Sequence, residues 1–308
     1  QLFVRWLADG SVLRLTNLTE QPNDLTWSPD GRQLAFTMPV AAEHKPLQVD
    51  LPKPPEGAKW AEPPKIIDRV VYRIDGEGYL PNAYPQVFVI AADGGAARQL
   101  TSGDFRHEGP LSFTPDGKQL LFAANRHKDA DYEPADTEVY ALTLSTAEMR
   151  ALTDRRGPDA GPQVSPDGKR IAYLGYDDKH LGYQNTRLYV MDVDGKHPRS
   201  LTDTLDRDVQ RVYWAGDGAS LYVDYGDQGA YRIARVDLAG KITPLAGDLG
   251  GTDLTRPYTG GTFSVARDGS YAYTRQSAAN TAALAVGHGT QAPRTLVGCN
   301  QVLFGERE

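Results

Sequence analysis

The most regular feature of the chain is a short stretch in which apolar and outward positions alternate on one side of an Asp-Gly turn. In VSPDGKRIAYLG, Val164–Gly175, the residues Ile171 and Tyr173 alternate with smaller or outward residues behind Asp167-Gly168. A period of two is that of a β-strand, and Asp-Gly between two such runs is a hairpin signal. Pro fixes φ at a turn position, Asp can accept from the next backbone amides, and Gly tolerates a positive φ. The stretch therefore predicts strand, turn and strand, with the aspartate as scaffold rather than as a catalytic group.

Near-copies of this hairpin recur along the chain. They are WSPDGRQLAF, FTPDGKQLLF, VSPDGKRIAY, WAGDGASLYV and VARDGSYAYT, whose aspartates stand at 30, 116, 167, 217 and 268. A second marker closes each unit, in the form Arg-x-Leu-Thr or a shortened version, at Arg14–Thr16, Arg98–Thr101, Arg150–Thr153 and Arg199–Thr202. Another hairpin lies between the two markers, so each unit of about 50 residues holds four short strands.

Four-stranded units at this spacing predict an all-β fold, a β-propeller of four-stranded antiparallel blades. No unit shows a 3.6-residue apolar period over ten residues, which excludes a helical solenoid. We expect the propeller to span residues 1–300, with five complete blades and a partial one visible and seven blades in the intact protein. The partial blade is residues 1–16, which supply only two outer strands. We therefore expect the chain to be a fragment cut inside a blade.

The spacing breaks once, between the first and second copies, where an insertion occupies residues 39–85. Its beginning is rich in proline, which cannot occupy a central strand, so it is predicted to be a loop leaving the blade. Its second half, IIDRVVYRIDGEGYL, returns to strand-like alternation around a turn at Asp75-Gly76. Trp60, in the Pro-rich part, is expected to pack against the propeller and hold the loop there, rather than to contact another domain.

The composition of the chain excludes several classes of partner and site. The net charge of −7 and the absence of any Lys/Arg-rich run argue against a nucleic-acid partner. The single cysteine, Cys299, excludes an internal disulfide framework and a Cys-clustered zinc site. No apolar run approaches the roughly 18–20 residues that span a bilayer, so no membrane partner is expected. We predict no metal and no cofactor, and a soluble protein for which the cytoplasm is favoured over the periplasm.

Several segments resemble a known family. They are PEGAKWAEPPKIIDRVVYRIDGEGYL, FVIAADGGAARQLTSGD, SFTPDGKQLLFAANRHKDADYE and YLGYDDKHLGYQNTRLYVMDVDG. Together they resemble the N-terminal propeller of prolyl-oligopeptidase-family serine peptidases, in particular the acylaminoacyl-peptidase or dipeptidyl-peptidase branch. The resemblance covers essentially the whole chain. The Ser-Pro-Asp-Gly hairpin also occurs in the periplasmic Tol-system propeller, so a non-enzymatic, protein-binding propeller stays as the alternative.

The resemblance implies a two-domain enzyme. An α/β-hydrolase domain of the same protein carries the Ser, Asp and His, and the propeller caps it, gates access to short peptides and contributes substrate contacts. Residues 301–308 resemble the start of the link to that domain. The chain itself has no Gly-x-Ser-x-Gly nucleophile elbow, so we assign it no catalytic residue and expect it to be inactive alone. The resemblance leaves a homo-oligomer open. A propeller lyase or glycosidase is disfavoured, because no carboxylate or histidine set recurs at matching blade positions.

A cap domain that binds the charged ends of a peptide needs side chains of opposite charge at fixed positions on its surface. In the insertion we single out Arg73, Glu77 and Tyr79, with a plain hairpin turn at Asp75-Gly76 and an ion pair of Arg73 between blades as the alternative. In the loop 123–133 we single out Arg126, Asp131 and Tyr132, with a structural Arg–Asp pair as the alternative. Arg207, in Asp203–Gln210, is the last candidate, and the acidic residues around it lack calcium-loop spacing.

Overall fold

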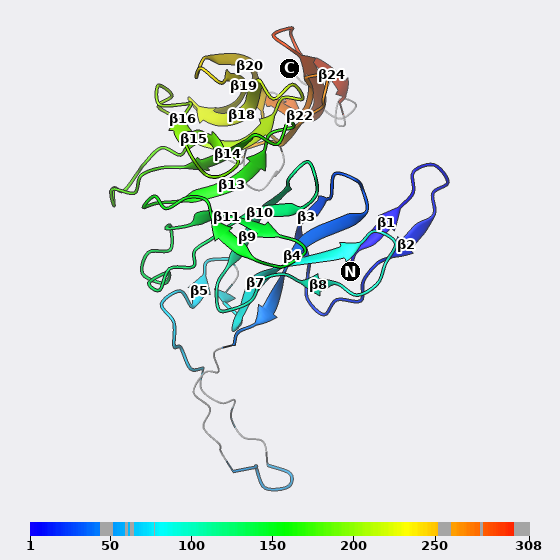
Figure 1. The fold of residues 1–308 in the computed structure, drawn as a ribbon, viewed down its shortest axis with the longest axis vertical. Helices are drawn as coiled ribbons and strands as arrows, with labels where there is room; N and C mark the ends of the chain where they lie inside the picture. The colour runs from blue at the N-terminus through cyan, green and yellow to red at the C-terminus, as the bar shows by residue number, and fades with distance from the viewer. Residues whose placement is uncertain are drawn as a thin grey trace.

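The computed structural model describes residues 1–43, 52–58, 61, 65–76, 78–251, 260–277 and 280–298. In this part of the chain every regular element is a β-strand, and the sheets follow one another in chain order (Figure 1). The predicted all-β fold is confirmed: a two-stranded partial blade is followed by three antiparallel sheets of four strands and one of eight. No helix in these described stretches has the length and apolar character that crossing a membrane requires.

We number the blades in chain order. Blade 1 is the partial blade, with β1 (Phe3–Arg5) and β2 (Val12–Arg14). Blade 2 is β3 (Asn23–Trp27), β4 (Gln33–Ala41), β7 (Ala83–Ala91) and β8 (Arg98–Gln99). Blade 3 is β9 (His107–Phe113), β10 (Gln119–Ala124), β11 (Glu138–Thr143) and β12 (Met149–Ala151). Blade 4 is β13 (Asp159–Val164), β14 (Arg170–Gly175), β15 (Arg187–Asp192) and β16 (Arg199–Ser200).

The last two blades are joined. Blade 5 is β17 (Val209–Trp214), β18 (Ser220–Asp227), β19 (Ala230–Asp237) and β20 (Ile242–Leu249). Blade 6 is β21 (Phe263–Val265), β22 (Ser270–Ser277), β23 (Asn280–His288) and β24 (Arg294–Val297). A single bridge between Leu249 and Arg275 links β20 to β22, so the two blades form one eight-stranded sheet. The segment between β4 and β7 leaves blade 2 and contains a small hairpin of β5 (Arg73–Ile74) and β6 (Gly78–Tyr79).

The repeated Asp-Gly hairpin is held by its own side chains. In the first copy, Ser28 Oγ donates to Asp30 Oδ1 at 2.6 Å and the Arg32 amide donates to the same oxygen at 3.0 Å. Gly31 has φ +68°, in the region that favours glycine. Hydrogen bonds from the Ser28 hydroxyl and the Arg32 amide hold the pKa of Asp30 below its ordinary value. The aspartate is thus an acceptor inside its own turn.

The Arg-x-Leu-Thr marker also has a structural explanation. Its threonine hydroxyl accepts a backbone N–H of the neighbouring third strand: Thr101 accepts from Val87, and Thr202 from Leu188, each at 2.9 Å. The preceding leucine is buried in each copy, for example Leu201 at 4% exposure. The marker therefore fastens the short outer strand to its blade at the point where the backbone ladder begins.

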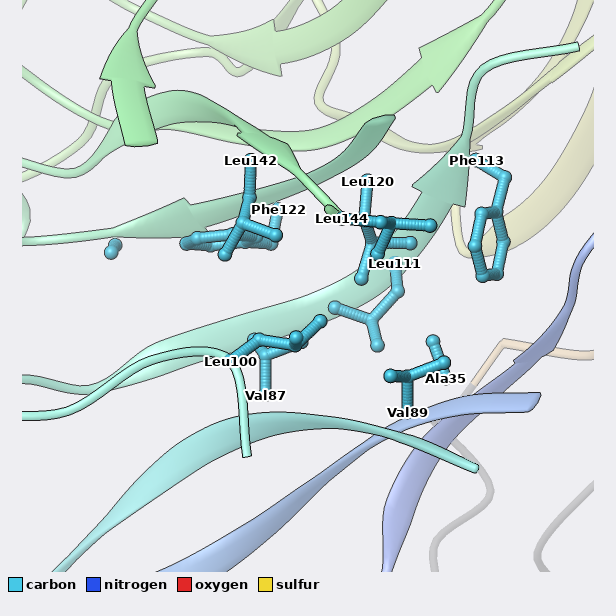
Figure 2. Close-up of a cluster of buried hydrophobic side chains, with 11 residues drawn as sticks. Ala35, Val87, Val89, Leu100, Leu111, Phe113, Leu120, Phe122, Leu142 and Leu144 are labelled. Carbon is cyan, nitrogen blue, oxygen red and sulfur yellow. The ribbon is translucent and has the colours of Figure 1, made fainter. Parts of the chain in front are cut away.

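Apolar side chains from successive blades pack together. The central strands of a blade are buried on both faces. Because successive side chains of a strand point to opposite faces, they contact the preceding and the following blade in turn. In β10, Leu120 and Phe122 pack against blade 2, whereas Leu121 packs against blade 4. Figure 2 shows the cluster between blades 2 and 3, in which Val87 and Val89 point toward Leu111 and Leu120. The same arrangement recurs between every pair of consecutive blades.

Candidate functional site

Strand register places the insertion and the loop between β10 and β11 at the same end of neighbouring blades. In blade 3, His107 pairs with Ala124, and Ala124 pairs with Glu138. In blade 2, Ala41 pairs with Ala83 at the root of the insertion. Antiparallel pairing puts the loop after each second strand at one end of the sheet and the Asp-Gly turns at the other. Two segments that lie far apart in sequence are thereby brought side by side.

These segments line two adjoining hollows, of about 330 Å³ and about 700 Å³, which we call the insertion groove. Residues from the insertion, from the connection between β8 and β9 and from the β10–β11 loop line both hollows: Arg69, Tyr84, Asp104, Phe105, Ala130 and Asp131. The smaller hollow is additionally lined by Ile74, Arg106 and Glu108, and the larger one by Lys128 and Tyr132. The groove thus combines apolar and aromatic surface with charges of both signs.

Two contacts shape the insertion side of the groove. Arg69 Nη2 donates to the carbonyl oxygens of Leu80 and Pro81, at 2.9 and 2.8 Å. The Val70 amide donates to Asp131 Oδ2 at 3.2 Å, which connects the insertion to the β10–β11 loop across 61 residues of sequence. Asp131, one of the residues expected from sequence, therefore lines the groove and also fastens its two walls together.

The β5–β6 hairpin carries two more of the expected residues. Arg73 pairs with Tyr79 across it, and both are exposed, Tyr79 at 54%. The Tyr79 ring has Lys65 Nζ 3.8 Å from its centroid and lies 6.1 Å from the Tyr72 ring. Glu77 and Trp60 lie outside the described residues.

Arg126 is held beneath the groove by a histidine that the sequence analysis did not single out. Arg126 Nη1 lies 2.8 Å from His107 Nε2, and His107 Nδ1 lies 3.2 Å from Pro85 O. A guanidinium only donates and a carbonyl only accepts, so His107 is neutral with its hydrogen on Nδ1. Burial, as the largest cause, lowers the pKa of His107 to about 4. The Arg126 guanidinium lies 4.4 Å from the centroid of Phe105, which lines the groove, and the alternative Arg–Asp pair inside the loop does not occur among the ion pairs of the described residues.

The remaining expected residues divide between two places. Tyr132 lines the larger hollow and is 77% exposed. Arg207 precedes blade 5, where its Nη2 lies 2.9 Å from Asp227 Oδ1, and Asp227 also binds Arg232 Nε at 2.8 Å. Arg207 is therefore engaged in an ion-pair network in blade 5, and its contact with substrate stays a prediction. Arg69, Phe105 and His107 carry no motif in the sequence, and only their place in the fold reveals them.

Two groups of His and carboxylate side chains in the described part of the chain have ligand atoms close enough together to hold a metal ion. One is His127, Asp136 and Glu138, at the return of the β10–β11 loop to blade 3. Burial raises the pKa of Glu138 to about 7, and the carboxylates of Asp159 and Asp136 add to the shift. The other is Glu133, Asp178 and His180, where Arg156 Nη2 lies 3.0 Å from Glu133 Oε1.

Sequence comparison relates the chain to peptidases. Residues 68–178 match the family described as the dipeptidyl peptidase IV N-terminal region. The chain is 26% identical over 259 residues to an uncharacterized peptidase, YuxL, of Bacillus subtilis, a match that covers 80% of this chain and 38% of that protein. It is 25% identical over 214 residues to dipeptidyl-peptidase 5 of Porphyromonas gingivalis, covering 64% of this chain and 29% of that protein. The chain therefore spans well under half the length of either peptidase.

Solved structures show the same fold. The acylaminoacyl peptidase of Pyrococcus horikoshii matches with a TM-score of 0.72 at 16% identity, over 99% of this chain and 42% of that one. TolB of Acinetobacter baumannii matches with a TM-score of 0.50 at 18% identity, over 70% of this chain and 49% of that one. The Tol-type alternative is thus a structural neighbour, but it fits a smaller part of this chain.

Proposed function

Because this chain is an N-terminal propeller domain of a prolyl-oligopeptidase-family peptidase, we propose that it caps a serine-hydrolase domain and helps to hold a short peptide substrate. The parent protein then hydrolyses short peptides as an exopeptidase or oligopeptidase. The hydrolase domain supplies the Ser, Asp and His, and the propeller restricts entry and supplies contacts to the peptide.

The observation that carries this proposal is the insertion groove. Charges of both signs line the groove: Asp131 and Glu108 are acidic, and Arg69 and Lys128 are basic. A short peptide is a zwitterion with an apolar or polar body, so a groove of mixed charge and aromatic surface suits its ends. We propose that Asp131 and Tyr132 contact the peptide directly, and that Arg73, Glu77, Tyr79, Arg126 and Arg207 complete the set.

Exposed apolar residues of the insertion support the docking of a second domain beside the groove. Ile66, Ile67, Val70 and Tyr72 are each 40% or more exposed. Contiguous apolar residues at a surface are typical of interaction sites. The insertion leaves blade 2 at the end that also carries the groove, so a domain seated there covers the groove's opening.

The test is the chemistry of the full-length gene product. We expect it to react covalently with a fluorophosphonate probe and to cleave dipeptide and acyl-aminoacyl chromogenic substrates. The 308-residue chain alone serves as the control and stays unlabelled, because it has no nucleophile elbow.

A full-length protein that the probe does not label overturns the proposal. A gene that ends with this propeller, with no hydrolase domain following, favours the Tol-type reading of a protein-binding module. The two readings are therefore separated by one labelling experiment and the length of the intact polypeptide.

A further inference from the structure

Three metal-type ligands converge where the β10–β11 loop returns to blade 3. They come from His127 near the start of the loop, Asp136 near its end, and Glu138, the first residue of β11. We propose that these three side chains form a binding site for a divalent transition-metal cation, with Zn²⁺ as the best-fitting ion. One imidazole and two carboxylates are a donor set that Zn²⁺ accepts, with a fourth position left for water.

The geometry is close to that of a bound ion. His127 Nε2 lies 3.6 Å from Asp136 Oδ2 and 3.6 Å from Glu138 Oε1, and all three ligand atoms lie within 4.8 Å of one another. Two ligands at bond lengths of about 2.0–2.1 Å in a tetrahedral site are roughly 3.4 Å apart. Each measured distance from the imidazole therefore exceeds the ideal by only about 0.2 Å.

Hydrogen bonds hold each carboxylate by one oxygen and leave the other aimed at the imidazole. Asp136 Oδ1 accepts the Gly157 amide at 2.9 Å, while Oδ2 faces His127. Glu138 Oε2 accepts the Thr153 hydroxyl, while Oε1 faces His127. Outer contacts of this kind orient metal ligands before the ion binds.

Within the described part of the chain, the two carboxylates have little competition from other charged side chains. The Glu138 side chain is only 4% exposed, and among the described residues no Lys or Arg forms an ion pair with it or with Asp136. His127 Nε2 is buried and has no hydrogen-bond partner, although 40% of the His127 side chain is exposed. Buried charges are normally paired or bound to a metal, and apart from His127 itself no cationic side chain of the described residues pairs with these two carboxylates.

The second group provides a natural contrast. Arg156 Nη2 lies 3.0 Å from Glu133 Oε1 and 2.9 Å from His180 Nε2, so a guanidinium already neutralises that group. The same types of side chain thus occur twice in the structure, once with a built-in cation and once without. Only the group without one is assigned to a metal.

An ion at this position ties the start of the β10–β11 loop to the first residue of β11. His127 also lines the larger hollow of the insertion groove. The bound ion therefore fixes the wall of the groove that carries Asp131 and Tyr132. This role is structural and does not depend on the proposed peptidase activity.

Isothermal titration of Zn²⁺ into the tag-free, chelator-treated chain tests the site. A Cys299→Ser background removes the one thiol that could compete for Zn²⁺. We expect one ion per chain, a higher melting temperature with Zn²⁺, and reversal by EDTA. His127→Ala and the isosteric Glu138→Gln should each weaken binding more than about tenfold. The matched control, His180→Ala in the group filled by Arg156, should leave binding unchanged.

Several results overturn the site. The first is no saturable binding at about 100 µM Zn²⁺, a concentration far above the dissociation constants of structural zinc sites. The others are unchanged binding in His127→Ala and loss of binding in His180→Ala alone. Binding of Ca²⁺ in place of Zn²⁺ also overturns it, because it would mean that the imidazole takes no part. Near-UV circular dichroism of Glu138→Gln separates loss of the site from loss of the fold. No readout involves peptide hydrolysis, so failure here is distinct from failure of the proposed function.

Discussion

At the scale of single residues, one buried histidine determines how Arg126 is held. His107 donates through Nδ1 to Pro85 O and accepts from Arg126 through Nε2, and its side chain has no solvent exposure. Protonation would place a donor opposite the Arg126 guanidinium and add a second positive charge in a buried site. The neutral ring is therefore part of the support beneath Phe105 and the insertion groove.

Replacing His107 by Asn should change how stability depends on pH. The native pKa of about 4 lies below the ordinary value of 6.5. Between these values the unfolded chain binds more protons, so the wild type loses stability as pH falls from 6.5 toward 4. The loss is about 2 kcal/mol between pH 7 and pH 4.5. Urea unfolding at both pH values should show the wild-type advantage over His107→Asn shrinking by that amount.

The comparison with the variant is necessary because Glu138 and Asp159 titrate in the same range with the opposite sign. Burial, as the largest cause, raises their pKa values, to about 7 and about 6. Their protonation in the native state therefore favours folding as pH falls, and it is common to both proteins. Parallel pH profiles for wild type and His107→Asn would show that His107 is not the responsible group.

Asp131→Asn tests the proposed substrate contact in the full-length protein. The change removes the charge and keeps the shape of a side chain that lines both hollows of the groove. Loss of one charge-assisted contact of about 1.5 kcal/mol should raise KM about tenfold for a short peptide with a free amino end, with kcat little changed. The control is Asp129→Asn, an exposed carboxylate two residues away, which should leave KM unchanged. Equal effects of both variants would contradict a specific contact.

At the scale of elements, the repeated threonine supplies the acceptor for a backbone N–H of the third strand of its blade. Thr202 is 1% exposed, and its Oγ1 accepts the Leu188 amide at 2.9 Å. A buried N–H without an acceptor is costly, which explains why Thr ends the marker in four blades. The preceding Leu anchors the same point in the apolar core.

Thr202→Val should destabilise the fold by about 2 kcal/mol, because it preserves volume but leaves the Leu188 amide without its acceptor. Chemical unfolding of the chain measures the difference. Thr204→Val, two residues on at an exposed position, is the matched control, and its effect should stay within about 0.5 kcal/mol. A similar effect of the two changes would remove the reason given for the marker.

At the scale of the whole molecule, stability resides between blades rather than within them. Leu221 of blade 5 packs with Leu188 and Val190 of blade 4, and all three are almost fully buried. Tyr222, the next residue, packs on the other side with Tyr271 of blade 6. Each central strand therefore belongs to two clusters at once.

Leu221→Ala should cost about 3 kcal/mol, the usual loss for a buried leucine that leaves a cavity. Hydrogen exchange should accelerate in β14 and β15 of blade 4 as well as in β18, because the cluster spans both blades. The strands of blade 2 should be unaffected. Leu181→Ala, at a side chain 62% exposed, is the control and should change neither quantity. Acceleration confined to blade 5 would contradict the shared cluster.

The sequence by itself determined the blades. Period-two alternation, Asp-Gly turns and the Leu-Thr marker act through neighbours in sequence or across one hairpin, so local chemistry specifies them. The four-stranded sheets with a two-stranded first blade are found as the repeats predict. The resemblance to the propeller of prolyl-oligopeptidase-family peptidases is likewise confirmed by the comparisons.

Only the tertiary structure decided which functional groups meet. Val70 and Asp131 lie 61 residues apart and touch because blade 3 packs beside blade 2. Within blade 3, the pairing of β9 with β10 places Arg126 beside His107, and at blade 5 Arg207 pairs with Asp227. His127, Asp136 and Glu138 follow no known metal motif, and strand register alone brings them together. Contacts between loops of different blades depend on how blades are placed, and no local pattern encodes that placement.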